Sequence, residues 1–471
     1  MSTLGELFND IHARHTEYTN QNNLAGIEGL ISEYENLLNH APDEIAFLFA
    51  LGTVKLQLGM HGSAIALFQQ ALTINDQVPE ILNNLGSAWK GENDNVKAKE
   101  YYERALALRD DADYYNNMAT LYVNEGNPVE CERWARDGLV LSPEHSRIHW
   151  NLSLSLLEQG KWAEGFDEYE YGLKSLDRPD RNYEVPFWDG TPGKKIVVYG
   201  EQGMGDEIMW ASCLPDVMKD CDVVFDCHDR MIDIFTRSFK VKCYPTRKDN
   251  ELHWVQKEKL DAKVAIGSLF KFYRREGEFP KVPYLKADPR KVKKWRKKLE
   301  KLGPGPYVGV GWKAGGKKTR HDLRSLKLGW FKPVFEQGGT FVSLQYTADA
   351  GGKVKRFEED SGYKIHHWAD TVETGLGDNR FAGLNYDETV SLVGALDLVI
   401  CPNTTLVHLC GALGKDCWTL TPKACAWRYQ LQGSEMPMYG PWVRQFREEG
   451  VFSELLEQIA EEYGRYLRKA A

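Results

Sequence analysis

Three segments in the second half of the chain place glycines, hydroxyls and charges directly after apolar runs. The first is Gly200–Ile208, which follows the apolar run Lys195–Tyr199 and contains Gly203, Gly205 and Asp206. Glycines permit tight turning and close approach of a ligand, and the start of a following helix favours negative charge. Asp206 fits two interpretations: the N-cap of that helix or a catalytic base.

The second segment, Leu396–His408, is an apolar run followed by a polar turn with Asn403, Thr404 and Thr405. A helix that starts near Thr404 would direct free backbone N–H groups and two hydroxyls toward the carboxyl end of the strand. Ligands of open α/β sheets lie at that end, and a diphosphate suits such a helix start. Asn403, Thr404, Thr405 and His408 are therefore candidate ligand-binding residues. The alternative is an ordinary capped helix with His408 packed in the core.

The third segment, Gly309–Arg320, is an apolar run, a glycine-rich turn and a basic cluster that includes Lys313 and Lys317, with Arg324 shortly after. Lysine and arginine can neutralise the charge that develops on a leaving diphosphate. This pattern predicts phosphate recognition, and a solvated loop is the alternative.

Short apolar runs and helical patterns alternate around these segments, which predicts parallel sheets with helical crossovers. Strands are expected at 195–199, 222–227, 264–266, 307–312, 340–344, 396–400 and 417–420, and helices at 386–395, 405–413 and 455–467. The composition predicts two doubly wound lobes that divide near Gly303–Pro306.

The front of the chain repeats instead. Two series of small residues recur at intervals of 33 or 34 residues, and a third series, mostly aromatic, recurs at the same intervals. The three series are Gly52, Gly86, Ala119 and Ser153; Ala71, Ala105, Gly138 and Gly172; and Phe68, Tyr102, Ala135 and Tyr169. Small residues let paired helices approach closely, and neighbouring pairs must stack to bury their apolar faces. The spacing resembles the tetratricopeptide repeat (TPR), with four clear units and a degenerate one at Ile11–Glu44.

Charge divides the chain. Residues 1–185 hold 14 basic and 30 acidic residues, a net of −16, and the remainder has a net of +7. The basic part suits an anionic ligand, whereas the acidic part should repel nucleic acid and accept basic or neutral peptides. The stretch Lys291–Lys301 carries an apolar stripe, so a solvated helix face is favoured over a nucleic-acid patch. The start of the chain lacks a secretory pattern, no run is long enough to span a bilayer, and nine scattered cysteines suggest reduced thiols. A cytoplasmic location is expected.

Residues 187–471 resemble the heptosyltransferase-related glycosyltransferases of the GT-B fold (glycosyltransferase family 9), in the form fused to TPRs. The segments that carry the resemblance are Phe187–Gly190, Glu201–Ile208, Ser343–Gln345, Val407–Lys415 and Trp427–Tyr429. The order of domains is also similar to that of the O-linked N-acetylglucosamine transferase.

The resemblance implies a role for each matching position. Asp206 would be the general base, Thr404 and Thr405 would hold the donor diphosphate, and Gln345 would lie near the nucleobase or diphosphate.

Two positions depart from the family pattern. Asn403 stands where an aspartate is common, and Tyr346 stands where a basic residue often follows the glutamine. The positive charge that binds the donor phosphate would then come from Lys313, Lys317 or Arg324.

The sequence therefore predicts a TPR α-superhelix over 1–176, a connector over 177–194 and GT-B lobes over 195–303 and 304–471. The predicted activity is inverting transfer of a sugar from a nucleoside-diphosphate sugar to an acceptor hydroxyl. The TPRs would recruit the acceptor or a partner protein. Because the second half has no Asp-x-Asp pair at a strand end, no obligatory metal or cofactor is expected. Two other functions fit: a non-catalytic scaffold with a vestigial nucleotide-binding domain, and a phage-type enzyme that glycosylates modified DNA bases.

Overall fold

A computed structural model describes residues 3–247, 252–314, 322–372 and 386–470. The chain divides into two compact units, residues 1–155 and 156–471, and each is described by itself. Within the described residues, no helix is long and apolar enough to cross a membrane.

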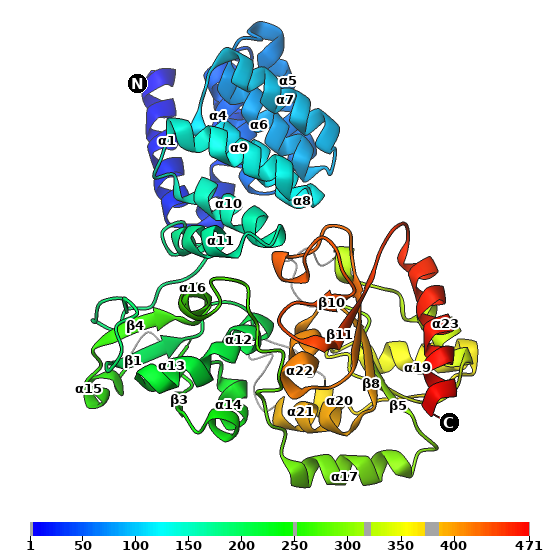
Figure 1. The fold of residues 1–471 in the computed structure, drawn as a ribbon. Coiled ribbons are helices and arrows are strands. Elements are labelled where there is room, and N and C mark those ends of the chain that lie inside the picture. Colours follow the sequence, from blue (N-terminus) through cyan, green and yellow to red (C-terminus); the bar gives the residue numbers. More distant parts are fainter. Residues whose placement is uncertain (1–2, 248–251, 315–321, 373–385, 471) are drawn as a thin grey trace. The chain divides into compact units, whose positions relative to one another are not determined.

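The first unit is entirely helical in its described residues (Figure 1). Its helices are α1 (Leu4–Asn20), α2 (Leu24–Gly29), α3 (Ile31–His40), α4 (Ile45–Gln57), α5 (His61–Ile74), α6 (Pro79–Gly91), α7 (Asn95–Leu108), α8 (Ala112–Glu125), α9 (Pro128–Leu141) and the start of α10 (Ser146–Glu158). Helices α4 and α5, α6 and α7, and α8 and α9 pack as pairs. The first three helices pack with α4 around a core that includes Tyr34 and Leu37, at the position of the predicted degenerate unit.

Close approach within the pairs depends on the repeated small residues. A Cβ atom on Gly86 of α6 would lie 2.7 Å from the ring of Tyr102 on α7 and 3.0 Å from the Ala98 carbonyl oxygen. Gly52 of α4 faces the Phe68 ring of α5 in the same way. The predicted pairing of a small residue with an aromatic ring is therefore confirmed at both positions.

The second unit contains two sheets (Figure 1). The smaller has the order β3-β2-β1-β4, with all strands parallel. Its strands are β1 (Lys195–Tyr199), β2 (Asp222–Asp226), β3 (Lys242–Tyr244) and β4 (Ala262–Ala265). The larger has the order β10-β11-β9-β8-β5-β6-β7, and only the β10–β11 pair is antiparallel. Its strands are β5 (Tyr307–Val310), β6 (Thr340–Ser343), β7 (Ile365–His366), β8 (Leu398–Pro402), β9 (Cys417–Thr421), β10 (Glu435–Met436) and β11 (Gly440–Arg447).

The helices of this unit lie before, between and after the strands of the two sheets. They are α11 (Trp162–Tyr169), α12 (Met204–Trp210), α13 (Leu214–Asp220), α14 (Ile232–Phe239), α15 (Val255–Glu258), α16 (Leu269–Tyr273), α17 (Pro289–Glu300), α18 (Lys332–Glu336), α19 (Ala350–Ser361), α20 (Ala369–Val372), α21 (Tyr386–Ala395), α22 (Thr405–Leu413) and α23 (Phe452–Ala470). The order of strands reverses between β1 and β4 and again between β5 and β8. Such reversals open crevices at the carboxyl ends of the strands, so they are the first places to look for a ligand.

Several elements differ from the sequence prediction. The eight-residue strand β11 was not predicted, because its apolar residues are separated by arginine and glutamine. The sequence assigned helix α17 to the part of the chain before the predicted division at Gly303–Pro306. The helix instead packs against α21, which lies after that division. Trp295 and Leu299 of α17 are buried, as the predicted stripe requires, and Lys291 pairs with Asp387.

The packing of Gly86 against Tyr102 predicts opposite effects for two matched substitutions. Gly86→Ala should destabilise the first unit by about 1–3 kcal/mol, because the added methyl group overpacks the α6–α7 contact. Gly62→Ala should be neutral or stabilise by up to about 1 kcal/mol, because a Cβ atom there has no neighbour within 4 Å. Denaturation followed by circular dichroism measures both, and equal effects would contradict the packing account.

Candidate functional site

The first polar cluster lies where β8 ends and α22 begins, beside the strand-order reversal at β5. Thr404 is the N-cap of α22, but its side chain makes no capping hydrogen bond. Asn403 Oδ1 accepts hydrogen bonds from Thr419 at 2.7 Å and Thr421 at 3.1 Å. Among the described residues, Thr404 Oγ1 and Asn403 Nδ2 are buried without a hydrogen-bond partner. Buried polar atoms are normally paired, so this edge has unused hydrogen-bonding capacity.

Arg324 reaches the same place from a different loop. Its Nη1 donates a 2.6 Å hydrogen bond to the Asn403 carbonyl oxygen, and burial lowers the pKa of its guanidinium from the usual value. The structure therefore brings Arg324 together with the predicted Asn403–Thr405 cluster. Lys317, predicted for the same role, lies outside the described residues.

Gln345 braces the loop after β5. Its Oε1 accepts hydrogen bonds from the backbone N–H groups of Trp312 (3.0 Å) and Lys313 (2.8 Å), and its Nε2 donates to the Lys313 carbonyl (3.1 Å). The amide is buried and engaged with the backbone, so this side chain shapes the loop that carries Lys313.

Helix α12, which follows β1 of the smaller sheet, contacts helix α22, which follows β8 of the larger sheet. Gly205 of α12 lies at this contact. A Cβ atom on Gly205 would lie 3.0 Å from His408 Cδ2 and 3.2 Å from Thr405 Cα. A side chain at this position would therefore push α12 away from the start of α22.

His408 packs behind the start of α22. Its Nδ1 lies 3.0 Å from the Tyr439 hydroxyl and its Nε2 lies 3.4 Å from the Tyr429 hydroxyl. Burial, together with the positive charge of Arg324, lowers the pKa of the imidazole to about 3. The ring is therefore neutral at ordinary pH, and the alternative in which His408 is a packed core residue matches its surroundings.

Asp206 is the third residue of α12, whose N-cap is Gly203. The N-cap interpretation of Asp206 is therefore wrong. Its Oδ1 forms an ion pair with Arg428, which lies in the 3₁₀ helix Trp427–Tyr429 between β9 and β10. The two side chains are 22% and 16% exposed, so the pair is accessible from solvent. A Cβ atom on Gly203 would lie 2.9 Å from Asp206 Oδ2, so glycine leaves room for that oxygen.

The other strand-order reversal, between β1 and β4, is filled by protein. Arg178 donates from Nε to Glu201 Oε2 at 2.8 Å and from Nη2 to Glu201 Oε1 at 2.9 Å. The Gly267 N–H also donates to Glu201 Oε1 at 3.0 Å. This buried pair fills the space between the carboxyl ends of β1 and β4 with protein.

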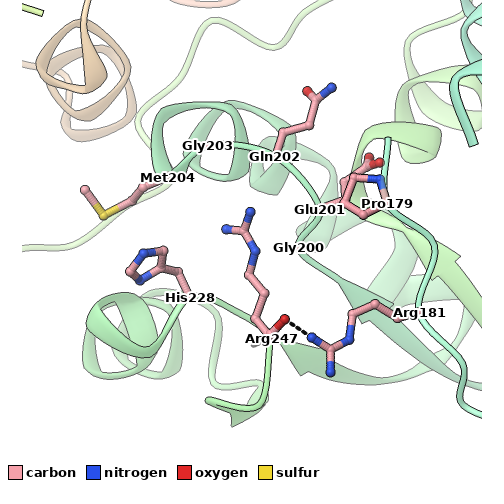
Figure 2. A pocket seen from close by; sticks show the side chains of 9 residues that line it. All are labelled: Pro179, Arg181, Gly200, Glu201, Gln202, Gly203, Met204, His228 and Arg247. Carbon is pink, nitrogen blue, oxygen red and sulfur yellow. Dashed lines mark hydrogen bonds between the residues drawn. The ribbon is translucent and has the colours of Figure 1, made fainter. Parts of the chain in front are cut away.

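A pocket of about 340 Å³ lies beside this pair, at the carboxyl ends of β1, β2 and β3. Figure 2 shows the residues that line it, which are Pro179, Arg181, Gly200, Glu201, Gln202, Gly203, Met204, His228 and Arg247. The sequence identified the glycines of this set but not Arg247, because nothing in the sequence shows that the residues after β3 lie near Gly203.

Glu207 lies behind the residues that line the pocket and is fully buried. It accepts a 2.8 Å hydrogen bond from the His228 N–H and a 2.9 Å ion-paired bond from Arg247 Nη1. Burial raises the pKa of the Glu207 carboxyl to about 7, although the Arg247 charge opposes the shift. This carboxyl therefore changes charge near neutral pH.

Comparisons with known proteins identify the repeats. The tetratricopeptide repeat model matches residues 45–77 and 79–111, so the amino-terminal helices include TPRs. Protein FlbA of Caulobacter vibrioides is 28% identical over 447 residues, which are 89% of this chain and 72% of that protein. Among solved structures, MamA is 20% identical with a TM-score of 0.30, over 34% of this chain and 93% of that one. PilF of Pseudomonas aeruginosa is 12% identical with a TM-score of 0.34, over 46% and 86%.

The raised pKa of Glu207 predicts a pH-dependent difference between the wild type and Glu207→Gln. Between pH 4.5 and 7 the unfolded carboxyl loses its proton while the folded one retains it, so the wild type loses stability as the pH rises. Relative to the variant, this loss should total about 3 kcal/mol and level off above pH 7.

Thermal unfolding of both proteins from pH 4 to 8 measures the difference. Glu276→Gln, at an exposed position, is the control and should follow the wild type. A constant difference between wild type and Glu207→Gln at every pH would contradict the assignment.

Proposed function

We propose that this protein is a GT-B glycosyltransferase that moves a sugar from a nucleoside-diphosphate sugar to an acceptor hydroxyl, with inversion. One observation carries the proposal. The contact between α12 and α22 packs Gly205, the residue before Asp206, against Thr405 at the start of α22. Direct displacement at a sugar carbon requires a base near the site that holds the diphosphate, and Asp206 is the carboxylate next to this contact.

The donor diphosphate would lie at the start of α22. Free backbone N–H groups at a helix start bind anions, and Thr404 Oγ1 and Asn403 Nδ2 are available as further donors. Arg324, held on the Asn403 carbonyl, would neutralise charge on the leaving diphosphate. Burial raises the pKa of the Tyr346 hydroxyl and the Arg324 charge opposes that shift. In this proposal Arg324 would take the role of the basic residue that often follows the glutamine in the glycosyltransferases that the sequence resembles.

Asp206 would take the proton from the acceptor hydroxyl. Arg428 engages Oδ1, and this leaves Oδ2, beside Gly203, as the oxygen that accepts the proton. The hydroxyl oxygen would attack the anomeric carbon as the bond to the diphosphate breaks, which inverts the configuration.

No residue of this scheme requires a metal ion. Within the described ranges, no group of three or more His, Cys, Asp or Glu side chains is arranged to hold one. Arg324 and the start of α22 would carry the electrostatic role.

The TPRs would recruit the acceptor or a partner protein. Residues 1–155 hold 10 basic and 22 acidic residues, a composition that favours basic or neutral peptides over nucleic acid. Lys291 of α17 is already paired with Asp387, and Arg296 with Asp397, so the basic stretch gives the DNA alternative little support.

A non-catalytic scaffold is the second candidate, and the Asp206–Arg428 ion pair favours it. In that interpretation the arginine occupies Asp206 Oδ1 and the pair serves only to hold two segments of the second unit together. In that case the α/β unit would bind a nucleotide without turning it over.

The donor assignment predicts weaker diphosphate binding in the double variant Thr404→Val/Thr405→Val. Valine keeps the shape and removes two hydroxyl donors to a charged group, which should reduce the binding free energy by about 2–4 kcal/mol. Calorimetry with a panel of nucleoside diphosphates measures the change. Thr73→Val, at an exposed site in the first unit, is the control, and unchanged affinity in the double variant would exclude the site.

The base assignment predicts that Asp206→Asn lowers turnover by about 10²–10⁴-fold, because asparagine cannot take a proton. The stability loss should stay near 1 kcal/mol, since the Arg428 pair is partly exposed. Asp233→Asn, at an exposed position early in α14, controls for loss of a carboxylate. Sugar transfer or donor hydrolysis is the assay, and wild-type turnover in Asp206→Asn would sink the assignment.

A further inference from the structure

The pocket at the carboxyl ends of β1, β2 and β3 is separate from the donor residues at the start of α22. Its lining is made of Pro179, Arg181, residues 200–204, His228 and Arg247 (Figure 2). Its volume of about 340 Å³ falls at the small end of the range of ligand sites. The pocket therefore suits a compact molecule rather than a nucleotide sugar.

Two arginines give the pocket its chemistry. Arg247 extends its guanidinium between His228 and the Gly200–Gly203 loop (Figure 2). Arg181 donates to the carbonyl oxygens of Thr246 and Arg247, so it holds the backbone that carries Arg247. The guanidinium fork of arginine matches the oxygens of carboxylates and phosphates.

The nearby carboxylates are engaged by the protein. Glu201 is bound by Arg178 and by the Gly267 N–H. Asp226 is buried and accepts from the Tyr183 hydroxyl at 2.6 Å and from the Thr246 N–H at 3.0 Å.

Glu207 is paired with Arg247 and is fully buried behind the lining. An anion in the pocket would therefore meet the Arg247 guanidinium ahead of this carboxyl.

The glycine-rich loop adds backbone donors. Within the described part of the chain, no hydrogen bond joins the N–H of Gln202 or Gly203 to another group. Both residues line the pocket, next to the Arg247 side chain. Unpaired N–H groups beside a guanidinium form an environment that stabilises negative charge.

Gly203 also connects the pocket to the proposed base. It lines the pocket, and its position for a Cβ atom is 2.9 Å from Asp206 Oδ2. The pocket and the proposed base therefore meet at the same glycine.

We infer that this pocket binds an anionic group of the acceptor, a carboxylate or a phosphate on a sugar-sized molecule, and that Arg247 is the side chain that recognises it. The acceptor role rests on the proposed function, whereas the binding of the anion does not. Arg181 is a positioning residue in this account.

The test is calorimetric titration of the full chain with glucose 6-phosphate, glucuronate and neutral glucose. The first two carry the phosphate and the carboxylate separately, so they distinguish the two sources of charge. At least one should bind saturably and glucose should not. The substitution Arg247→Gln should weaken binding of the anion about 10–100-fold, because it removes a hydrogen bond between charged groups.

Two further variants keep the test decisive. Glu207→Gln/Arg247→Gln removes the buried carboxyl that the single variant would leave unpaired, and it should lose the anion while remaining folded. Arg275→Gln removes an exposed arginine paired with Asp167, and it should bind like the wild type.

Binding must also survive Thr404→Val/Thr405→Val, which disables the donor site. Saturable binding of neither anion, or binding that resists the loss of Arg247, would overturn the inference. So would binding that disappears only in the threonine variant, because the anion would then occupy the donor site. Arg247-dependent binding without sugar transfer would uphold the pocket and reject the transferase, whereas transfer without such binding would do the reverse.

Discussion

The site depends on how closely α12 and α22 approach at Gly205. These helices follow strands of different sheets, and a Cβ atom on Gly205 would lie only 3.2 Å from Thr405 Cα, closer than most Cβ contacts. Since α12 carries Asp206 and α22 begins beside Thr404, one backbone approach determines the distance between the proposed base and the proposed diphosphate site.

Neighbouring interactions preserve that approach. The indole rings of Trp210 and Trp427 pack with centroids 5.6 Å apart, and Arg428, next to Trp427, pairs with Asp206. His408 of α22 contacts the hydroxyls of Tyr439 and Tyr429 through its two ring nitrogens, which anchors the helix. The ion pair connects α12 with the segment between β9 and β10 at the position where chemistry is proposed.

Local patterns in the sequence predicted much of the architecture. The 33–34-residue spacing located the small residues that face Phe68 and Tyr102, because repeat packing is set by neighbours in sequence. The helix start at Thr404 was predicted from a strand, a polar turn and a helical pattern, and the structure confirms it. Long-range contacts were not accessible in this way. Arg428 lies 222 residues from its partner Asp206, and nothing local distinguishes it from other arginines.

The same limit applies to Gln345 and Arg247. The resemblance to a family assigned Gln345 a position near the ligand, yet its amide braces the backbone of Trp312 and Lys313. Arg247 reaches the Gly203 loop only because β1, β2 and β3 end at one edge of the sheet.

Release of nucleoside diphosphate from nucleotide sugars tests the central claim most directly. The full-length wild type would be incubated with each donor of a panel that varies the base and the sugar, and the free diphosphate would be quantified by chromatography. The account predicts that at least one donor releases its diphosphate, by slow hydrolysis alone and faster when a suitable acceptor is present. Saturable diphosphate binding without release from any donor would contradict it and identify the α/β unit as a nucleotide-binding scaffold.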